Sequence, residues 1–134
     1  GNICRSPMAQ GLFAHALPAS QVLSAGLGAM VGSPADETAL RLMHERGIDI
    51  SAHRAQQITS PLCLKSDLVL VMDSEQKQRV ETLYPQARGR VFRLAEPLKQ
   101  DIPDPYRQGE IAFRDALTLL DRSVNEWLRR IQKL

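Results

Sequence analysis

The sequence predicts a single α/β domain in which a mostly parallel sheet carries helices on both faces. Strand-like segments at 21–25, 68–72 and 90–94 alternate with helical segments, and this alternation is typical of parallel α/β folds. A length of 134 residues suits one domain with a buried core, and no linker, repeat or low-complexity tract divides it. We therefore treat residues 1–134 as one domain.

The first half of the chain predicts two helices with a strand between them. Ser6 is placed to cap the first helix, and Pro18 ends it. Residues 21–25 are a short strand candidate that runs into a glycine-rich turn. A second helix is expected over 35–46, because Gly47 is a typical helix stop.

The second half predicts two strands and two helices. The uninterrupted apolar run over 68–72 is typical of a strand buried on both faces. A helix over 74–83, capped by its first serine, precedes the next strand at 90–94. After a proline-rich loop over 97–108, an apolar stripe with spacings of three and four predicts a long helix over 110–132.

Composition excludes several classes of function. A net charge of +2 is too small to indicate nucleic-acid binding, and no apolar run approaches the ~20 residues that cross a bilayer. Cys4 and Cys63 form neither a disulfide framework nor a metal-ligand pattern, and the three histidines include no His-x-x-x-His pair. We expect no metal, no cofactor, no nucleic-acid partner and no membrane insertion, and a cytoplasmic location.

The opening of the chain has the features of an anion-binding loop at a helix N-terminus. It consists of Gly1, Asn2, Ile3, Cys4, Arg5 and Ser6, which we call the phosphate loop, followed by Pro7. Backbone N–H groups and the helix dipole attract an anion at such a position. Arg5 adds a planar charged fork that can bind two phosphate oxygens, and Pro7 is well tolerated where a helix begins.

These residues resemble the low-molecular-weight protein tyrosine phosphatases, whose loop reads Cys-x-Gly-Asn-x-Cys-Arg-Ser-Pro. In that family the attacking cysteine lies six residues before the loop arginine, which here is two residues before Gly1. Cys4 matches the second cysteine of the pattern and is not the nucleophile. The resemblance also implies a four-stranded sheet of order 2-1-3-4 whose first strand precedes Gly1, so we expect roughly ten further residues upstream.

The resemblance assigns catalysis to Arg5, as the phosphate clamp, and to Asp104, as the general acid that protonates the leaving tyrosyl oxygen. Asp104 lies in an Asp-Pro-Tyr motif, although Asp-Pro alone is a common turn pair. Asp101 is the rival acid, fits the motif less well and is expected to be solvated. Ser6 matches the serine that supports the attacking thiolate.

Further residues are expected around the loop. Tyr106 resembles the aromatic wall of the substrate pocket, although an ordinary loop tyrosine is the alternative. Asn2 tolerates a left-handed backbone, and Ser24 and His53 match a serine and a histidine that hydrogen-bond its side chain. The glycine-rich segment 26–32 fits a dinucleotide fingerprint poorly, so we interpret it, with Leu27, as another pocket wall.

The segment 26–32 is short and aliphatic, as in bacterial members tied to capsule and exopolysaccharide export. The implied substrate is phosphotyrosine on a tyrosine autokinase, hydrolysed through a cysteinyl-phosphate. One alternative is a thioredoxin-coupled arsenate reductase, which needs two further neighbouring cysteines where only Cys63 is present. Another is a catalytically dead phosphate- or phosphotyrosine-binding domain, should the nucleophile be missing from the intact protein.

Overall fold

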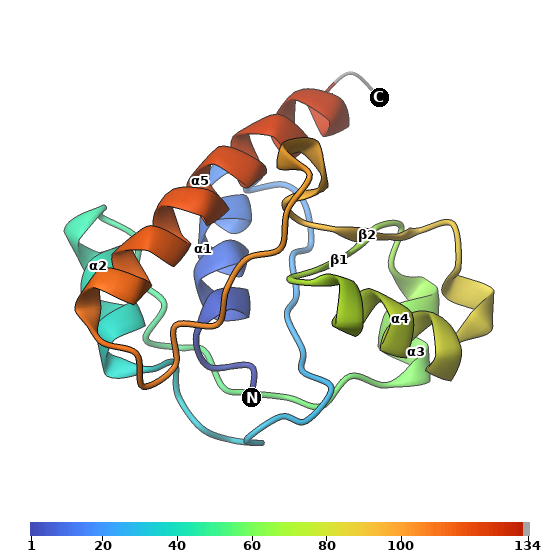
Figure 1. Ribbon diagram of the computed structural model, residues 1–134, viewed down its shortest axis with the longest axis horizontal. Coiled ribbons are helices and arrows are strands. Elements are labelled where there is room, and N and C mark those ends of the chain that lie inside the picture. Colours follow the sequence, from blue (N-terminus) through green and yellow to red (C-terminus); the bar gives the residue numbers. More distant parts are fainter. Residues whose placement is uncertain (133–134) are drawn as a thin grey trace.

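The computed structural model describes residues 1–132 and places a short parallel sheet between two groups of helices (Figure 1). In chain order the elements are α1 (Arg5–Ala16), α2 (Glu37–Glu45), α3 (Ser60–Lys65), β1 (Val69–Val71), α4 (Ser74–Leu83), the 3₁₀-helix η1 (Pro85–Ala87), β2 (Val91–Arg93), the 3₁₀-helix η2 (Glu96–Leu98) and α5 (Glu110–Gln132). Helices α1, α2 and α5 pack together on one side, and α3 and α4 lie on the other. This arrangement confirms the predicted α/β class.

The sheet within residues 1–132 consists of β1 and β2, which run parallel with Val69 opposite Val91 and Val71 opposite Arg93. The strand predicted at 21–25 is wrong, since only Gly26 beyond it forms an isolated bridge, to Gln57. A ladder needs a neighbouring strand to accept and donate its hydrogen bonds, and no described segment lies beside 21–25 in that way. The four-strand order stays a prediction.

Two predicted helix caps are wrong. Helix α1 begins at Arg5, so Ser6 lies inside its first turn and does not cap it. Helix α4 is capped by Asp73, whose carboxylate accepts from the Gln76 N–H at 2.8 Å, and not by Ser74. Helix α1 thus starts two residues earlier than a Ser6 cap would allow, and α4 starts one residue earlier than a Ser74 cap would allow. Helix α3 was not predicted, whereas α5 has the predicted bounds.

The main core lies where α1, α2 and α5 meet the carboxyl end of the sheet. Met8, Leu42, Met43 and Leu120 are almost fully buried there. Trp127 of α5 joins this core to the sheet, because its indole N–H donates to the Leu94 carbonyl at 2.6 Å. Because α1 packs in this core with α2 and α5, it is held in place, and so is the end of the loop that leads into it.

A smaller core lies beneath α4 on the opposite side of the strands. It consists of Cys63, Val71, Val80, Ala87 and Val91. Because β1 has side chains in both cores, the two groups of helices are joined through the strands. No helix among residues 1–132 has the length and apolar character that a bilayer crossing requires.

Candidate active site

Residues 2–4 of the phosphate loop are buried, and the loop is held by backbone hydrogen bonds. The Ile3 carbonyl accepts from the Asp36 N–H at 2.8 Å, and the Gly1 carbonyl accepts from the Met30 N–H at 3.0 Å. The N–H groups of residues 2–6 donate to no residue among 1–132. Carbonyls fixed to the protein and unused amides at the start of α1 are the arrangement that an anion-binding loop needs.

Asn2 gives the loop its shape. Its φ of +63° is left-handed, a conformation that asparagine tolerates better than most residues. Its side-chain oxygen accepts from the Gln56 N–H at 3.0 Å, and its backbone carbonyl lies 2.7 Å from Nε2 of His53. A Cβ on Gly26 would stand 3.0 Å from the Asn2 Cβ, so this close approach favours glycine there.

The contacts around Asn2 differ from the predicted ones. His53 meets the backbone carbonyl and not the side chain, while the Ser24 hydroxyl donates to Gln10 of α1 at 2.8 Å. Gln56, which the sequence did not indicate, holds the side-chain oxygen through its backbone. Almost every residue type has a backbone N–H, so the sequence alone could not single out Gln56 as this donor. The part that Ser24 and His53 play in the reaction stays a prediction.

Arg5 connects the phosphate loop to the proline-rich loop that precedes α5. Its Nη1 donates to the Ile102 carbonyl at 2.6 Å and lies 3.4 Å from the Asp73 carboxylate. In Figure 1 the orange segment before α5 passes the N-terminal end of α1, where Arg5 begins the helix. One neutral oxygen and one long ionic contact leave much of the guanidinium charge for an anion.

Asp104 is exposed in this proline-rich loop, and its carboxylate accepts from the Tyr106 N–H at 3.1 Å. Burial raises the pKa of the Cys4 thiol to about 12, and the carboxylates of Asp36 and Asp104 add to this shift. The hydrogen bond from Arg5 to the Ile102 carbonyl holds the loop carrying Asp104 against the phosphate loop. Cys4 is a neutral thiol at physiological pH, which suits a residue other than the nucleophile.

Asp101 is exposed, as expected, but its carboxylate is also held by hydrogen bonds that the sequence did not indicate. Its Oδ1 accepts from Nη1 of Arg93 at 2.9 Å and from the N–H and hydroxyl of Ser74, each at 3.1 Å. The hydrogen bond from Arg93 lowers the pKa of the Asp101 carboxyl, and the bonds from Ser74 contribute as well. Sequence spacing did not indicate this contact, because the three residues come from three different elements.

The predicted pocket walls lie on different parts of the core. Tyr106 packs against the larger core, with the Arg107 guanidinium 5.0 Å from its ring centroid. Leu27 packs against the smaller core. Met30 lies closer to the loop, since its Cγ is 3.2 Å from where a Cβ on Gly1 would stand. That Leu27 and Tyr106 line one pocket stays a prediction, and Met30 is a neighbour the sequence analysis did not single out.

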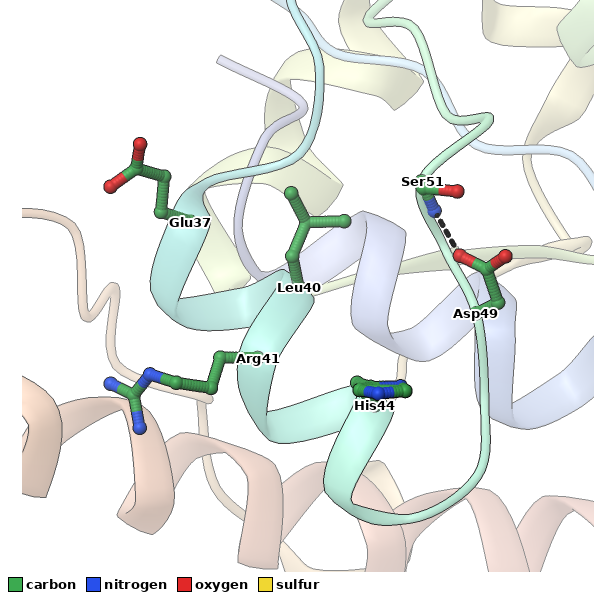
Figure 2. Close-up of a pocket in the computed structure, with 6 residues that line it drawn as sticks. All are labelled: Glu37, Leu40, Arg41, His44, Asp49 and Ser51. Carbon is green, nitrogen blue, oxygen red and sulfur yellow. Dashed lines mark hydrogen bonds between the residues drawn. The ribbon is translucent and has the colours of Figure 1, made fainter.

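A hollow of about 440 Å³ lies away from these residues, on the outer side of α2 (Figure 2). It is lined by Glu37, Leu40, Arg41, His44, Asp49 and Ser51. Two of its charged groups already have partners: Arg41 pairs with Glu110, outside the hollow, and Asp49 accepts from the N–H of Ser51 within it. No group of three or more His, Cys, Asp or Glu side chains within residues 1–132 could hold a metal ion. The phosphate loop is therefore the stronger candidate site.

Comparison with known proteins identifies a family. Residues 1–134 match the family described as low molecular weight phosphotyrosine protein phosphatase. The chain is 52% identical over 134 residues to a Ralstonia solanacearum protein named "Probable low molecular weight protein-tyrosine-phosphatase EpsP", covering 100% of this chain and 92% of that protein.

Solved structures agree with the family match. Vibrio vulnificus Wzb in complex with benzylphosphonate superposes with a TM-score of 0.93 at 38% identity, over 97% of this chain and 92% of that one. The YwlE arginine phosphatase from Geobacillus stearothermophilus superposes with a TM-score of 0.93 at 31% identity, over 99% and 88% of the two chains. Because the TM-scores are equal, the fold alone does not separate phosphotyrosine from phosphoarginine as substrate.

Proposed function

The chain belongs to the low molecular weight phosphotyrosine protein phosphatase family, and on that premise we propose that it hydrolyses protein phosphotyrosine through a cysteinyl-phosphate intermediate. The observation that carries the proposal is the phosphate loop with its unused amides, joined by Arg5 to the loop that bears Asp104. An amide cradle with one arginine can bind a phosphate dianion and stabilise the charge of its equatorial oxygens in the transition state.

In the first proposed step, a cysteine thiolate two positions before Gly1 attacks phosphorus. The bond between phosphorus and the tyrosyl oxygen breaks, and Asp104 gives its proton to that oxygen, which is a poor leaving group unless protonated. Arg5 and the amides of the phosphate loop hold the three equatorial oxygens. We propose that Ser6, in the first turn of α1, donates to the thiolate.

In the second step, water attacks the cysteinyl-phosphate and the bond between sulfur and phosphorus breaks. The Asp104 carboxylate takes a proton from the water, which restores the acid for the next turnover. Inorganic phosphate leaves and the thiolate is regenerated. No proton or electron is left over, and the step needs no metal because Arg5 and the amides carry the charge stabilisation.

The resemblance to the capsule and exopolysaccharide subgroup leads us to propose a bacterial tyrosine autokinase as the substrate. Benzylphosphonate, held by the Wzb relative, has an aromatic ring and a tetrahedral anion, as phosphotyrosine has. We propose that the protein acts in the cytoplasm, where the free thiols of Cys4 and Cys63 stay reduced.

The proposal is tested with the complete protein, including its residues upstream of Gly1. We expect hydrolysis of a phosphotyrosine peptide, little hydrolysis of a phosphoarginine peptide, and no arsenate-dependent oxidation of thioredoxin. A serine in place of the cysteine two positions before Gly1 serves as the control and should be inactive. Release of phosphate from phosphoarginine alone, or full activity of that serine variant, would contradict the proposal.

The role of Asp104 is tested by its asparagine variant. Asp104→Asn should lower kcat/KM for phenyl phosphate by about a hundredfold, because no proton reaches the leaving oxygen. The loss should be smaller for 4-nitrophenyl phosphate, whose leaving group needs less protonation. Phosphate release is measured for both substrates, and equal losses would mean that Asp104 is not the acid.

A further inference from the structure

We infer that Asp101 is a positioning residue that, through Arg93 and Ser74, sets where Asp104 stands relative to the phosphate loop. The inference rests on the proposed function, because it assigns to Asp104 the part of general acid. It concerns residues 101–106, which we call the acid loop.

Asp101 is the point at which the acid loop is tied to the sheet and to α4. The Oδ1 atom of Asp101 accepts one hydrogen bond from Arg93, the last residue of β2, and two from Ser74, the first residue of α4. Arg93 also donates to the Ser74 hydroxyl at 3.3 Å, so the three side chains form a closed triangle. Because β2 and α4 both pack against the smaller core, these three side chains attach the acid loop to a fixed part of the fold.

Ile102 is a second point at which the acid loop is attached, both to the sheet and to Arg5 of the phosphate loop. It is fully buried, and its N–H donates to the Met72 carbonyl at 2.9 Å, just beyond β1. Its carbonyl accepts from Arg5 at 2.6 Å. Asp101 and Ile102 therefore hold the start of the acid loop against the sheet and against the phosphate clamp at the same time.

The backbone between Ile102 and Asp104 has little conformational freedom. Pro103 precedes Asp104 and Pro105 follows it, and each proline fixes its own φ near −65°. Pro105 also restricts the backbone of Asp104 itself. The Asp104 carboxylate further accepts from the Tyr106 N–H. A shift at Asp101 would thus be passed along a stiff segment to the acid and not absorbed within it.

The contacts of Asp101 favour a positioning role over two others, donation of a proton to the substrate and stabilisation of the fold. Its carboxylate is already occupied by Arg93 and Ser74, so it is poorly placed to give a proton to a substrate. Its side chain is 47% exposed, and exposed ion pairs add little to stability. Misplacement of a catalytic group by about 1 Å, in contrast, can lower a rate by up to about a hundredfold.

The experiment compares Asp101→Asn with Glu96→Gln in the complete protein. Both carboxylates bind the same guanidinium, at 2.9 Å and 2.7 Å, but among residues 1–132 no hydrogen bond or ion pair joins the Glu96 side chain to the acid loop. We expect Asp101→Asn to lower kcat/KM about tenfold for phenyl phosphate and less than about threefold for 4-nitrophenyl phosphate. Glu96→Gln should leave both values within about twofold, and neither variant should change the Ki of inorganic phosphate or shift the Tm by more than a few degrees.

Two further variants complete the test. Asp101→Glu keeps the charge and should recover part of the loss for phenyl phosphate. Ser74→Ala removes one donor to Asp101 and should show a weaker loss of the same kind, and it replaces Asp101→Asn as the decisive variant if that protein does not fold.

The outcomes separate the inference from the proposed function. The positioning role is overturned if Asp101→Asn lowers kcat/KM equally for both substrates, or has no more effect on kcat/KM than Glu96→Gln. The proposed function still stands in that case, provided that Asp104→Asn lowers kcat/KM more for phenyl phosphate than for 4-nitrophenyl phosphate. If Asp104→Asn shows no such selectivity, or the unmodified protein hydrolyses neither substrate, both are overturned. Selective loss in both Asp101→Asn and Asp104→Asn supports both.

Discussion

The phosphate loop and the acid loop meet at Arg5 but are held in place by opposite means. Backbone hydrogen bonds from Met30, Asp36 and Gln56 hold the phosphate loop, whose residues 2–4 are buried. The acid loop buries Ile102 and Pro105, but its first residue is held by side-chain contacts, in which the exposed Asp101 carboxylate binds the half-buried Arg93.

This difference matches what each loop has to do. The phosphate loop must present several amides at fixed positions, and backbone bonds in a buried setting give that rigidity. The acid must give a proton to a leaving group and then take one from water, which requires contact with solvent. We therefore expect changes within the phosphate loop to affect binding and folding together, and changes at the acid loop to affect mainly the proton transfer.

The largest effect is expected from Arg5→Lys in the complete protein. An ammonium group cannot bind two phosphate oxygens in the planar fork that arginine provides, so kcat/KM for aryl phosphates should fall by about a hundredfold to a thousandfold. Arg122→Lys, on the exposed side of α5, is the matched control and should leave kcat/KM unchanged. Near-normal turnover by Arg5→Lys would remove Arg5 from the proposed mechanism.

A smaller effect, on stability, is expected from two substitutions at Asn2. Asn2→Gly loses the hydrogen bond to Gln56 but allows the φ of +63°, whereas Asn2→Ala loses the bond and is also strained. The free energy of unfolding in urea should therefore be lower for Asn2→Ala than for Asn2→Gly by about 1 kcal/mol. Equal values would mean that the left-handed backbone is not under strain.

The smallest effect is expected at the two thiols, Cys4 in the phosphate loop and Cys63 in α3. The pKa of Cys4 is raised to about 12, chiefly by burial, and burial also raises the pKa of Cys63. At pH 7.5 both groups are therefore protonated, and mass spectrometry should detect almost no iodoacetamide label on either in the folded protein. Urea-unfolded protein, in which both should react, is the control, and rapid labelling of folded Cys4 would contradict a buried neutral thiol.

Local sequence was sufficient for the long helix and for the phosphate loop. The bounds of α5 were correct because an apolar stripe on a helix can be recognised from neighbouring positions alone. Arg5 was found for a similar reason, since the whole phosphate loop lies within seven consecutive residues. The family followed from the same short motif.

Only the tertiary structure decided how the loops are held. The Gln56 backbone reaches Asn2 across 54 positions, and Arg93 and Ser74 reach Asp101 from two separate elements. The segment 21–25 likewise had the composition of a strand, but a strand depends on a partner elsewhere in the chain. By itself the sequence was enough to predict which groups bind an anion and which group moves a proton. Their relative placement depended on long-range hydrogen bonds, because such bonds join groups that no local pattern relates.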